Sequence, residues 1–175
     1  DYDPAAGRQY FEKEHTQIPD NLRALRELDR LCPRRGRLLE IGSCLGIFLD
    51  RIRRDGWDAT GLEPDPGPAT YARREYQLPI VDGTLPNPKF RDGEFDAVIM
   101  LHVIEHMPDP GENLREIRRI IKPGGVLVIE TPRFDSLMFG ILGRRERSIQ
   151  NWHGHIYFFT LATLRRLVEK HKFEV

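Results

Sequence analysis

The sequence predicts an α/β fold of three layers, in which helices cover both faces of a doubly wound parallel sheet. Short apolar runs alternate along the chain with amphipathic stretches of helical length. Residues 95–101 form a continuous apolar run, typical of a strand buried on both faces. The apolar run 37–41 leads directly into a turn of small residues and a second apolar run, the strand, loop and helix that open such sheets.

Each element is placed by its own pattern. Leucines at steps of three predict an amphipathic helix that ends before Pro33, and Thr160 is placed to cap the last helix. The expected strands are residues 37–41, 57–62, 78–81, 95–101 and 126–130. The expected helices are residues 21–31, the stretch through 48–52, 66–76, about 111–121 and 161–170. Residues 122–125, Lys-Pro-Gly-Gly, are expected to end the fourth of these helices.

Composition narrows the class of protein. The 175 residues suit one domain, and the 27 basic residues balance the 27 acidic ones, so we expect no nucleic-acid partner. Cys32 and Cys44 have neither zinc-type nor disulfide-framework spacing, which favours the reducing cytoplasm. No apolar run approaches the roughly 20 residues of a membrane span, so we expect no stable membrane insertion.

The turn after the first expected strand is suited to binding a nucleotide-like ligand, because glycine lets the main chain approach closely. The dinucleotide fingerprint Gly-x-Gly-x-x-Gly would need glycine where Cys44 and Ile47 stand, which disfavours NAD. No lysine follows to make a phosphate loop. The pattern is instead acid-x-Gly-x-x-x-Gly, with Glu40, Gly42 and Gly46.

This pattern resembles motif I of class I S-adenosylmethionine-dependent methyltransferases, whose usual form is Glu/Asp-x-Gly-x-Gly-x-Gly. Cys44 is the departure, because it replaces the middle glycine. Glu63 lies about twenty residues further on, at the end of the second strand, where an acidic residue can accept hydrogen bonds from ribose hydroxyls. Residues 95–110 and 121–132 are similar to the fourth- and fifth-strand blocks of the small-molecule, ubiquinone-type enzymes, the methyltransferase type 11 and 23 groups.

The resemblance implies a Rossmann-like sheet, S-adenosyl-L-methionine as cofactor and S-adenosyl-L-homocysteine as product. By position, residues 42–46 pass under the methionyl part, Glu63 holds the ribose, and residues 84–85 flank adenine, with Asp82 as an alternative to Thr84. The implied cofactor-binding residues are Glu40, Gly42, Ser43, Cys44, Gly46, Glu63, Pro64, Thr84, Leu85, Leu101 and His102.

One domain, 1–175, is therefore expected to have four parts. They are N-terminal cover helices (1–34), a cofactor-binding core (35–132), an insertion over the acceptor side (133–160), and a C-terminal helix with the start of a sixth strand (161–175). The family fold normally ends in a hairpin of strands six and seven, and this hairpin is expected to be truncated here. The resulting open sheet edge predicts a possible contact with a second copy of the chain.

Two histidines on the acceptor side, His153 and His155, are candidates for catalysis. A histidine near its ordinary pKa can take the proton of an acceptor hydroxyl as the oxygen attacks the sulfonium methyl. The alternative is that both are hydrogen-bonding struts around Trp152.

Residues 102–106 also spell His-x-x-Glu-His, a pattern that binds zinc when it lies on a sustained helix. Here the pattern follows a strand directly, and Pro108 and Pro110 come soon after it. We therefore expect no metal, and expect Glu105 and His106 to brace the turn.

The sequence thus predicts an adenosylmethionine-dependent methyltransferase that acts on a small or medium-sized acceptor, with oxygen as the preferred acceptor atom and nitrogen and carbon as open alternatives. Methyl transfer depends mainly on aligning nucleophile, methyl group and sulfur in a water-poor pocket, which agrees with a chain that carries a cofactor loop and no catalytic triad. The alternatives are a non-catalytic adenosylmethionine-binding or interaction domain and, from the same fold, an NAD-dependent oxidoreductase.

Overall fold

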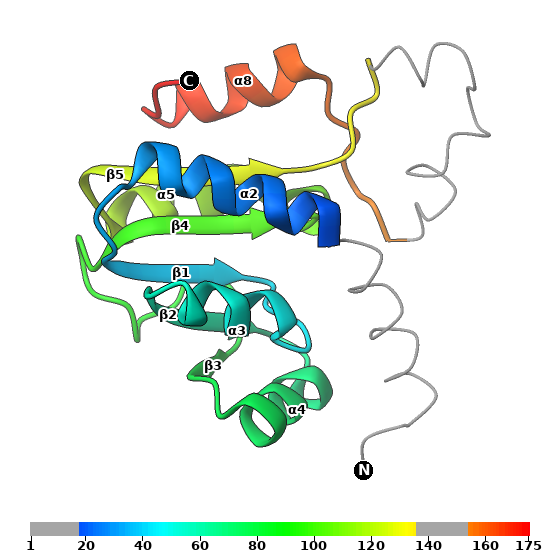
Figure 1. Cartoon of the computed structure of the whole chain (residues 1–175). Helices are drawn as coiled ribbons and strands as arrows, with labels where there is room; N and C mark the ends of the chain where they lie inside the picture. The colour runs from blue at the N-terminus through cyan, green and yellow to red at the C-terminus, as the bar shows by residue number, and fades with distance from the viewer. Residues whose placement is uncertain (1–17, 136–153) are drawn as a thin grey trace.

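The computed structural model describes residues 18–135 and 154–175. They form a five-stranded, all-parallel sheet of order β3-β2-β1-β4-β5 (Figure 1). The strands are β1 (Arg37–Ile41), β2 (Asp58–Glu63), β3 (Ile80–Asp82), β4 (Phe95–Leu101) and β5 (Ile121–Glu130). The helices are α2 (Ile18–Leu31), α3 (Ile47–Arg54), α4 (Pro66–Tyr76), the short 3-10 helix η1 (Ile104–His106), α5 (Pro110–Ile120) and α8 (Leu161–Lys170).

The three predicted layers are confirmed by two hydrophobic clusters, one on each face of the sheet. Alternate residues of β1 supply them, because successive side chains of a strand point to opposite faces. Leu38 packs with the apolar sides of α2, α3 and α4. Leu39 and Ile41 pack with α5 and α8. In Figure 1, α2 and α3 accordingly lie in front of the sheet and α5 lies behind it.

The strand order places a topological switch between β1 and β4. The chain leaves β1 toward β2 on one side and leaves β4 toward β5 on the other. The loops that follow β1 and β4 therefore diverge at the carboxyl edge of the sheet, where ligands bind in open α/β folds. The predicted cofactor turn is one of these two loops.

Local capping explains the helix starts that the sequence predicted well. Asp65 caps α4 by accepting a hydrogen bond from the Gly67 amide, and Pro66 occupies the first turn. Asp109 caps α5 in the same way through the Glu112 amide. Thr160 shares a reciprocal capping box with Thr163 at the start of α8, as expected.

Two predictions near β5 are wrong. The strand begins at Ile121 rather than at residue 126, and residues 122–125 form an irregularity opposite Asp96 between two paired segments. Lys122 within this irregularity binds the Asp96 carboxylate at 2.7 Å. At the other end of the domain, residues 173–175 follow α8 without forming a strand, and Phe173 packs against the core instead.

Several predictions fall on residues 1–17 and 136–153, which lie outside the described residues. They include the first part of the N-terminal cover segment, most of the insertion, and His153. In the described part of the chain, no helix combines the length and apolar character that crossing a bilayer requires.

Candidate functional site

The loop between β1 and α3 folds back on β2. The amides of Gly42 and Ser43 both donate to the carbonyl of Leu62, at 2.8 and 3.3 Å, and the Gly46 amide donates to the carbonyl of Ser43 at 2.8 Å. Gly42 and Gly46 have φ values of +74° and +78°, in the left-handed region that favours glycine. The loop therefore makes a tight turn that requires glycine at both ends.

Close contacts also exclude a side chain from these two positions. A Cβ on Gly42 would lie 2.6 Å from Cγ2 of Val103, in the loop after β4. A Cβ on Gly46 would lie 2.5 Å from Cδ1 of Leu78 and 2.9 Å from Cβ of Ala72. Gly42 thus brings the two loops of the switch point into contact, and Gly46 lets the start of α3 pack on α4.

Glu63, at the end of β2, is joined to this loop. Its carboxylate accepts hydrogen bonds from the Cys44 amide at 2.8 Å and from the Asp65 amide at 2.9 Å. The residue is only 7% exposed, and this burial raises the pKa of Glu63, although the two amide bonds oppose the rise. Glu63, the acid that the sequence associated with the glycine loop, is therefore hydrogen-bonded directly to that loop.

The side chains of the other predicted cofactor-binding residues near this loop differ in how accessible they are to a ligand. Glu40 and Ser43 are buried, and Ser43 lies against Gly61, where a Cβ would come within 2.5 Å of its Oγ. Cys44 is half-buried, forms no disulfide and has a φ of 47°, and Pro64 is exposed. Ser43 can therefore meet a ligand in the loop only through its main chain.

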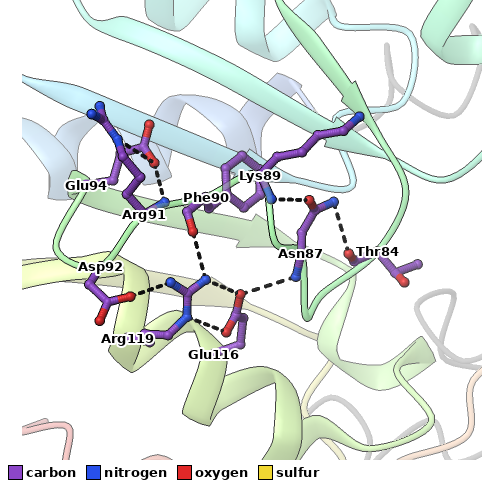
Figure 2. Close-up of polar contacts among 9 residues, drawn as sticks. All are labelled: Thr84, Asn87, Lys89, Phe90, Arg91, Asp92, Glu94, Glu116 and Arg119. Atoms are coloured by element: carbon purple, nitrogen blue, oxygen red, sulfur yellow. Dashed lines mark hydrogen bonds and ion pairs between the residues drawn. The ribbon is translucent and has the colours of Figure 1, made fainter.

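The loop after β3 is tied to α5 by a polar network (Figure 2). The Asn87 side chain donates to the carbonyl of Thr84 at 3.4 Å, and the Asn87 amide donates to Glu116 at 3.2 Å. Arg119 donates to both oxygens of Glu116 and to the carbonyl of Phe90. Its hydrogen bonds lower the pKa of Glu116, which keeps the carboxylate ionised.

This network fixes residues 84 and 85 beside the carboxyl edge of the sheet. Leu85 is buried, whereas Thr84 is exposed. Asp82, the alternative to Thr84, forms an ion pair with Arg73 at 2.6 Å. Both residues are exposed, and they differ in that the Asp82 carboxylate is already paired with Arg73.

The loop after β4 brings together residues that are far apart in sequence. Leu101 is half-buried, and His102 has a left-handed φ of 56° while its amide donates to the carbonyl of Glu130 at 2.8 Å. Three residues later, the carbonyl of Glu105 accepts from the amides of Ile156 and Tyr157 at 2.8 and 3.1 Å. The last part of the expected insertion is thus held against η1.

His155 lies in this junction. Its Nε2 is 4.0 Å from Oε1 of Glu105, its ring packs edge-on against His106, and its side chain is 9% exposed. Nδ1 of His102 is 3.8 Å from the same carboxylate oxygen. One predicted catalytic histidine therefore lies beside one predicted cofactor residue, and Glu105 lies between them.

Sequence reasoning missed two residues of this region. The Glu105 side chain is 1% exposed and accepts from the Thr131 hydroxyl at 2.9 Å, so it does more than brace a turn. Val103, which packs on Gly42, was not singled out. The His-x-x-Glu-His pattern was the only available signal, and it pointed to Glu105 without indicating its partner from the insertion.

The fold, the loop and its acidic partner define a class I methyltransferase domain. Residues 10–175 match the family model described as a methyltransferase domain, and the chain belongs to this family. A ubiquinone biosynthesis O-methyltransferase of Albidiferax ferrireducens is 30% identical over 116 residues, which are 59% of this chain and 44% of that protein. The chain thus spans about half the length of this relative.

Solved structures agree. A methyltransferase of Thermotoga maritima, described as a possible histamine N-methyltransferase, has a TM-score of 0.73 and 25% identity, over 95% of this chain and 79% of that one. Phosphoethanolamine N-methyltransferase 2 of Haemonchus contortus, solved in complex with S-adenosyl-L-methionine, has a TM-score of 0.66 and 20% identity, over 89% of this chain and 37% of that one. S-Adenosylmethionine is the cofactor of this family, and the NAD alternative is set aside.

Proposed function

We propose that the protein transfers a methyl group from S-adenosylmethionine to an oxygen of a small or medium-sized acceptor. The observation that carries the proposal is that the predicted cofactor loop lies close to the acceptor-side residues. Gly42 in this loop packs against Val103, and Glu105, two residues after Val103, lies 4.0 Å from His155. The O-methyltransferase name of the Albidiferax relative supports oxygen as the acceptor atom. The reaction breaks the bond from methyl to sulfur as the acceptor oxygen bonds the methyl carbon, and S-adenosylhomocysteine leaves.

The proposed cofactor pose uses the residues that the structure places along the carboxyl edge of the sheet. Glu63 keeps unused lone pairs on its two oxygens, because each accepts one amide, and these can accept from the ribose hydroxyls. Thr84 and Leu85 flank the adenine, Leu101 and His102 border the methionine end, and the main chain of residues 42–46 passes beneath it. When bound, the cofactor supplies an electrophilic methyl group on a sulfonium.

The raised pKa of Glu63 predicts that cofactor affinity depends on pH. Protonation removes the charge that strengthens the ribose hydrogen bonds, so affinity for S-adenosylhomocysteine falls as the pH drops through this raised pKa. The slope approaches tenfold per pH unit below that pKa, until the complex itself is protonated. Calorimetric titration between pH 5 and pH 8 measures it, and the slope should vanish in Glu63→Gln; a slope retained in that variant would assign the titration to another group.

On the acceptor side, we propose His155 as the group that takes the proton of the acceptor hydroxyl. The neighbouring carboxylate of Glu105 stabilises an imidazolium at His155 Nε2 through their 4.0 Å separation. His153 is proposed only from the sequence, since it lies outside the described residues.

Replacing His155 with alanine should lower turnover by about 10²- to 10⁴-fold, because that is the usual contribution of a positioned general base. Affinity for S-adenosylhomocysteine should stay within about twofold. The measurement is release of the homocysteine product with an acceptor found by screening hydroxyl compounds. His171→Ala is the matched control, since His171 lies outside the junction, at the end of α8. Unchanged turnover of His155→Ala would make this residue a strut.

A screen in which cofactor binds but no acceptor is methylated would instead favour the non-catalytic binding domain. Contact with a second copy through the sheet edge and a cytoplasmic location remain predictions. Among the described strands, β5 pairs only with β4.

A further inference from the structure

We propose that Glu105, His106 and His155 bind a divalent cation of the zinc type beside the acceptor position. One ligand atom from each of the three residues lies within 4.8 Å of the others. Two imidazoles and one carboxylate are a donor set that binds zinc and leaves a coordination position open. This reverses the expectation from the sequence, which rested on the missing helix, because the third ligand, His155, comes from the last part of the expected insertion.

The Glu105 carboxylate supplies the negative charge that a cation needs. Its Oε2 accepts from Thr131, but its Oε1 is buried and has no hydrogen-bond donor among the described residues. A buried carboxylate oxygen without a donor is unfavourable, because nothing replaces the hydrogen bonds that water would have donated to it. At 3.8 and 4.0 Å, the nearest nitrogens of His102 and His155 are too far for a hydrogen bond.

His106 is oriented to act as a ligand. Nδ1 of His106 lies 2.9 Å from the carbonyl of Gly154, which can only accept, so Nδ1 carries the proton and Nε2 keeps its lone pair. A backbone carbonyl that fixes the tautomer in this way is the usual support of a metal-binding histidine. Thr131 supports the carboxylate similarly.

The spacing requires only small movements. In a tetrahedral zinc site with bonds of about 2.0–2.1 Å, neighbouring ligand atoms lie about 3.3 Å apart. The 4.0 Å separation of His155 Nε2 and Glu105 Oε1 closes to this value by side-chain shifts on the order of 1 Å.

The open position would bind an oxygen of the acceptor and lower its pKa, a role that rests on the proposed function. In a metal-loaded protein, His155 would be a ligand and would not take the proton; the ion would favour the deprotonated acceptor, and the proton would pass to solvent. Cation binding itself is independent of the reaction, so it can be measured without an acceptor.

The test is competition for Zn²⁺ between the chelator-stripped chain and a chromophoric chelator. We expect the chain to withdraw one equivalent, and His106→Ala, His155→Ala and Glu105→Gln to weaken binding at least tenfold. Thr131→Val should weaken it about 10- to 100-fold, as loss of an outer-shell partner does. Co²⁺ should give visible absorption bands in the wild-type chain that are lost in His106→Ala.

His106→Ala is the ligand variant that we expect to disturb folding least, because the His106 side chain is only partly buried. It should keep the wild-type circular dichroism and S-adenosylhomocysteine affinity. His171→Ala is the control histidine and should bind Zn²⁺ as the wild type does. No Zn²⁺ uptake by the wild-type chain, or equal uptake by His106→Ala and His155→Ala, would overturn the site; loss of cofactor binding with Zn²⁺ uptake intact would count against the proposed function alone.

Discussion

Replacing Glu63 with alanine should weaken S-adenosylhomocysteine binding roughly 10- to 150-fold, which corresponds to about 1.5–3 kcal/mol for hydrogen bonds to a charged group. The variant loses the acceptor of the ribose hydroxyls. It also releases the amides of Cys44 and Asp65, so the loop loses one of the contacts that hold it against β2. Both effects reduce affinity, and isothermal calorimetry measures their sum.

The matched control is Glu75→Ala. Glu75 is also a glutamate, but it is partly exposed on α4 and pairs with its neighbour Arg74. It should leave the affinity within about twofold, because exposed ion pairs contribute little. Wild-type affinity in Glu63→Ala would mean that the cofactor does not use the end of β2.

Replacing Gly46 with alanine should destabilise the domain by about 2–5 kcal/mol. The left-handed backbone at φ +78° adds about 1–2 kcal/mol for a residue with a Cβ. Forcing that Cβ against Leu78 and Ala72, both buried, adds about 1–3 kcal/mol of overpacking. Chemical denaturation measures the loss of unfolding free energy.

Gly124 separates the two contributions. Its φ of +76° is nearly the same, but a Cβ there would meet no described atom within 4 Å. Gly124→Ala should therefore lose only the backbone contribution, about 1–2 kcal/mol. Equal losses in the two variants would show that the α3 and α4 contact can relax around a methyl group.

Elements with local signals were predictable from the sequence. Helix α4 begins at residue 66 and α8 begins at the Thr160 cap, both as predicted, because helix starts depend on a few neighbouring residues. The β4 boundaries also agree, since a continuous apolar run is read directly. The start of β5 was missed because Ile121 pairs with Phe95, which is distant in sequence. Residues 122–125, which were expected to end a helix, instead form an irregularity within the strand.

Some features of the candidate site were likewise predictable from the sequence, and others were not. Glu63 could be paired with the glycine loop by spacing, and the hydrogen bond to Cys44 agrees with that pairing. The direction of the Ser43 side chain could not be predicted, because it depends on Gly61 in a neighbouring strand. His155 lies near Glu105 because the amides of the next two residues, Ile156 and Tyr157, donate to the Glu105 carbonyl. Such contacts between distant segments cannot be predicted from a local sequence pattern.

The most direct test of the account is calorimetric titration of the whole chain with S-adenosylhomocysteine and, separately, with NADH. We predict one S-adenosylhomocysteine bound per chain, with affinity lost in Glu63→Ala, and no detectable heat from NADH. Binding of NADH without binding of S-adenosylhomocysteine would contradict the assignment of the Glu40 to Gly46 loop to adenosylmethionine.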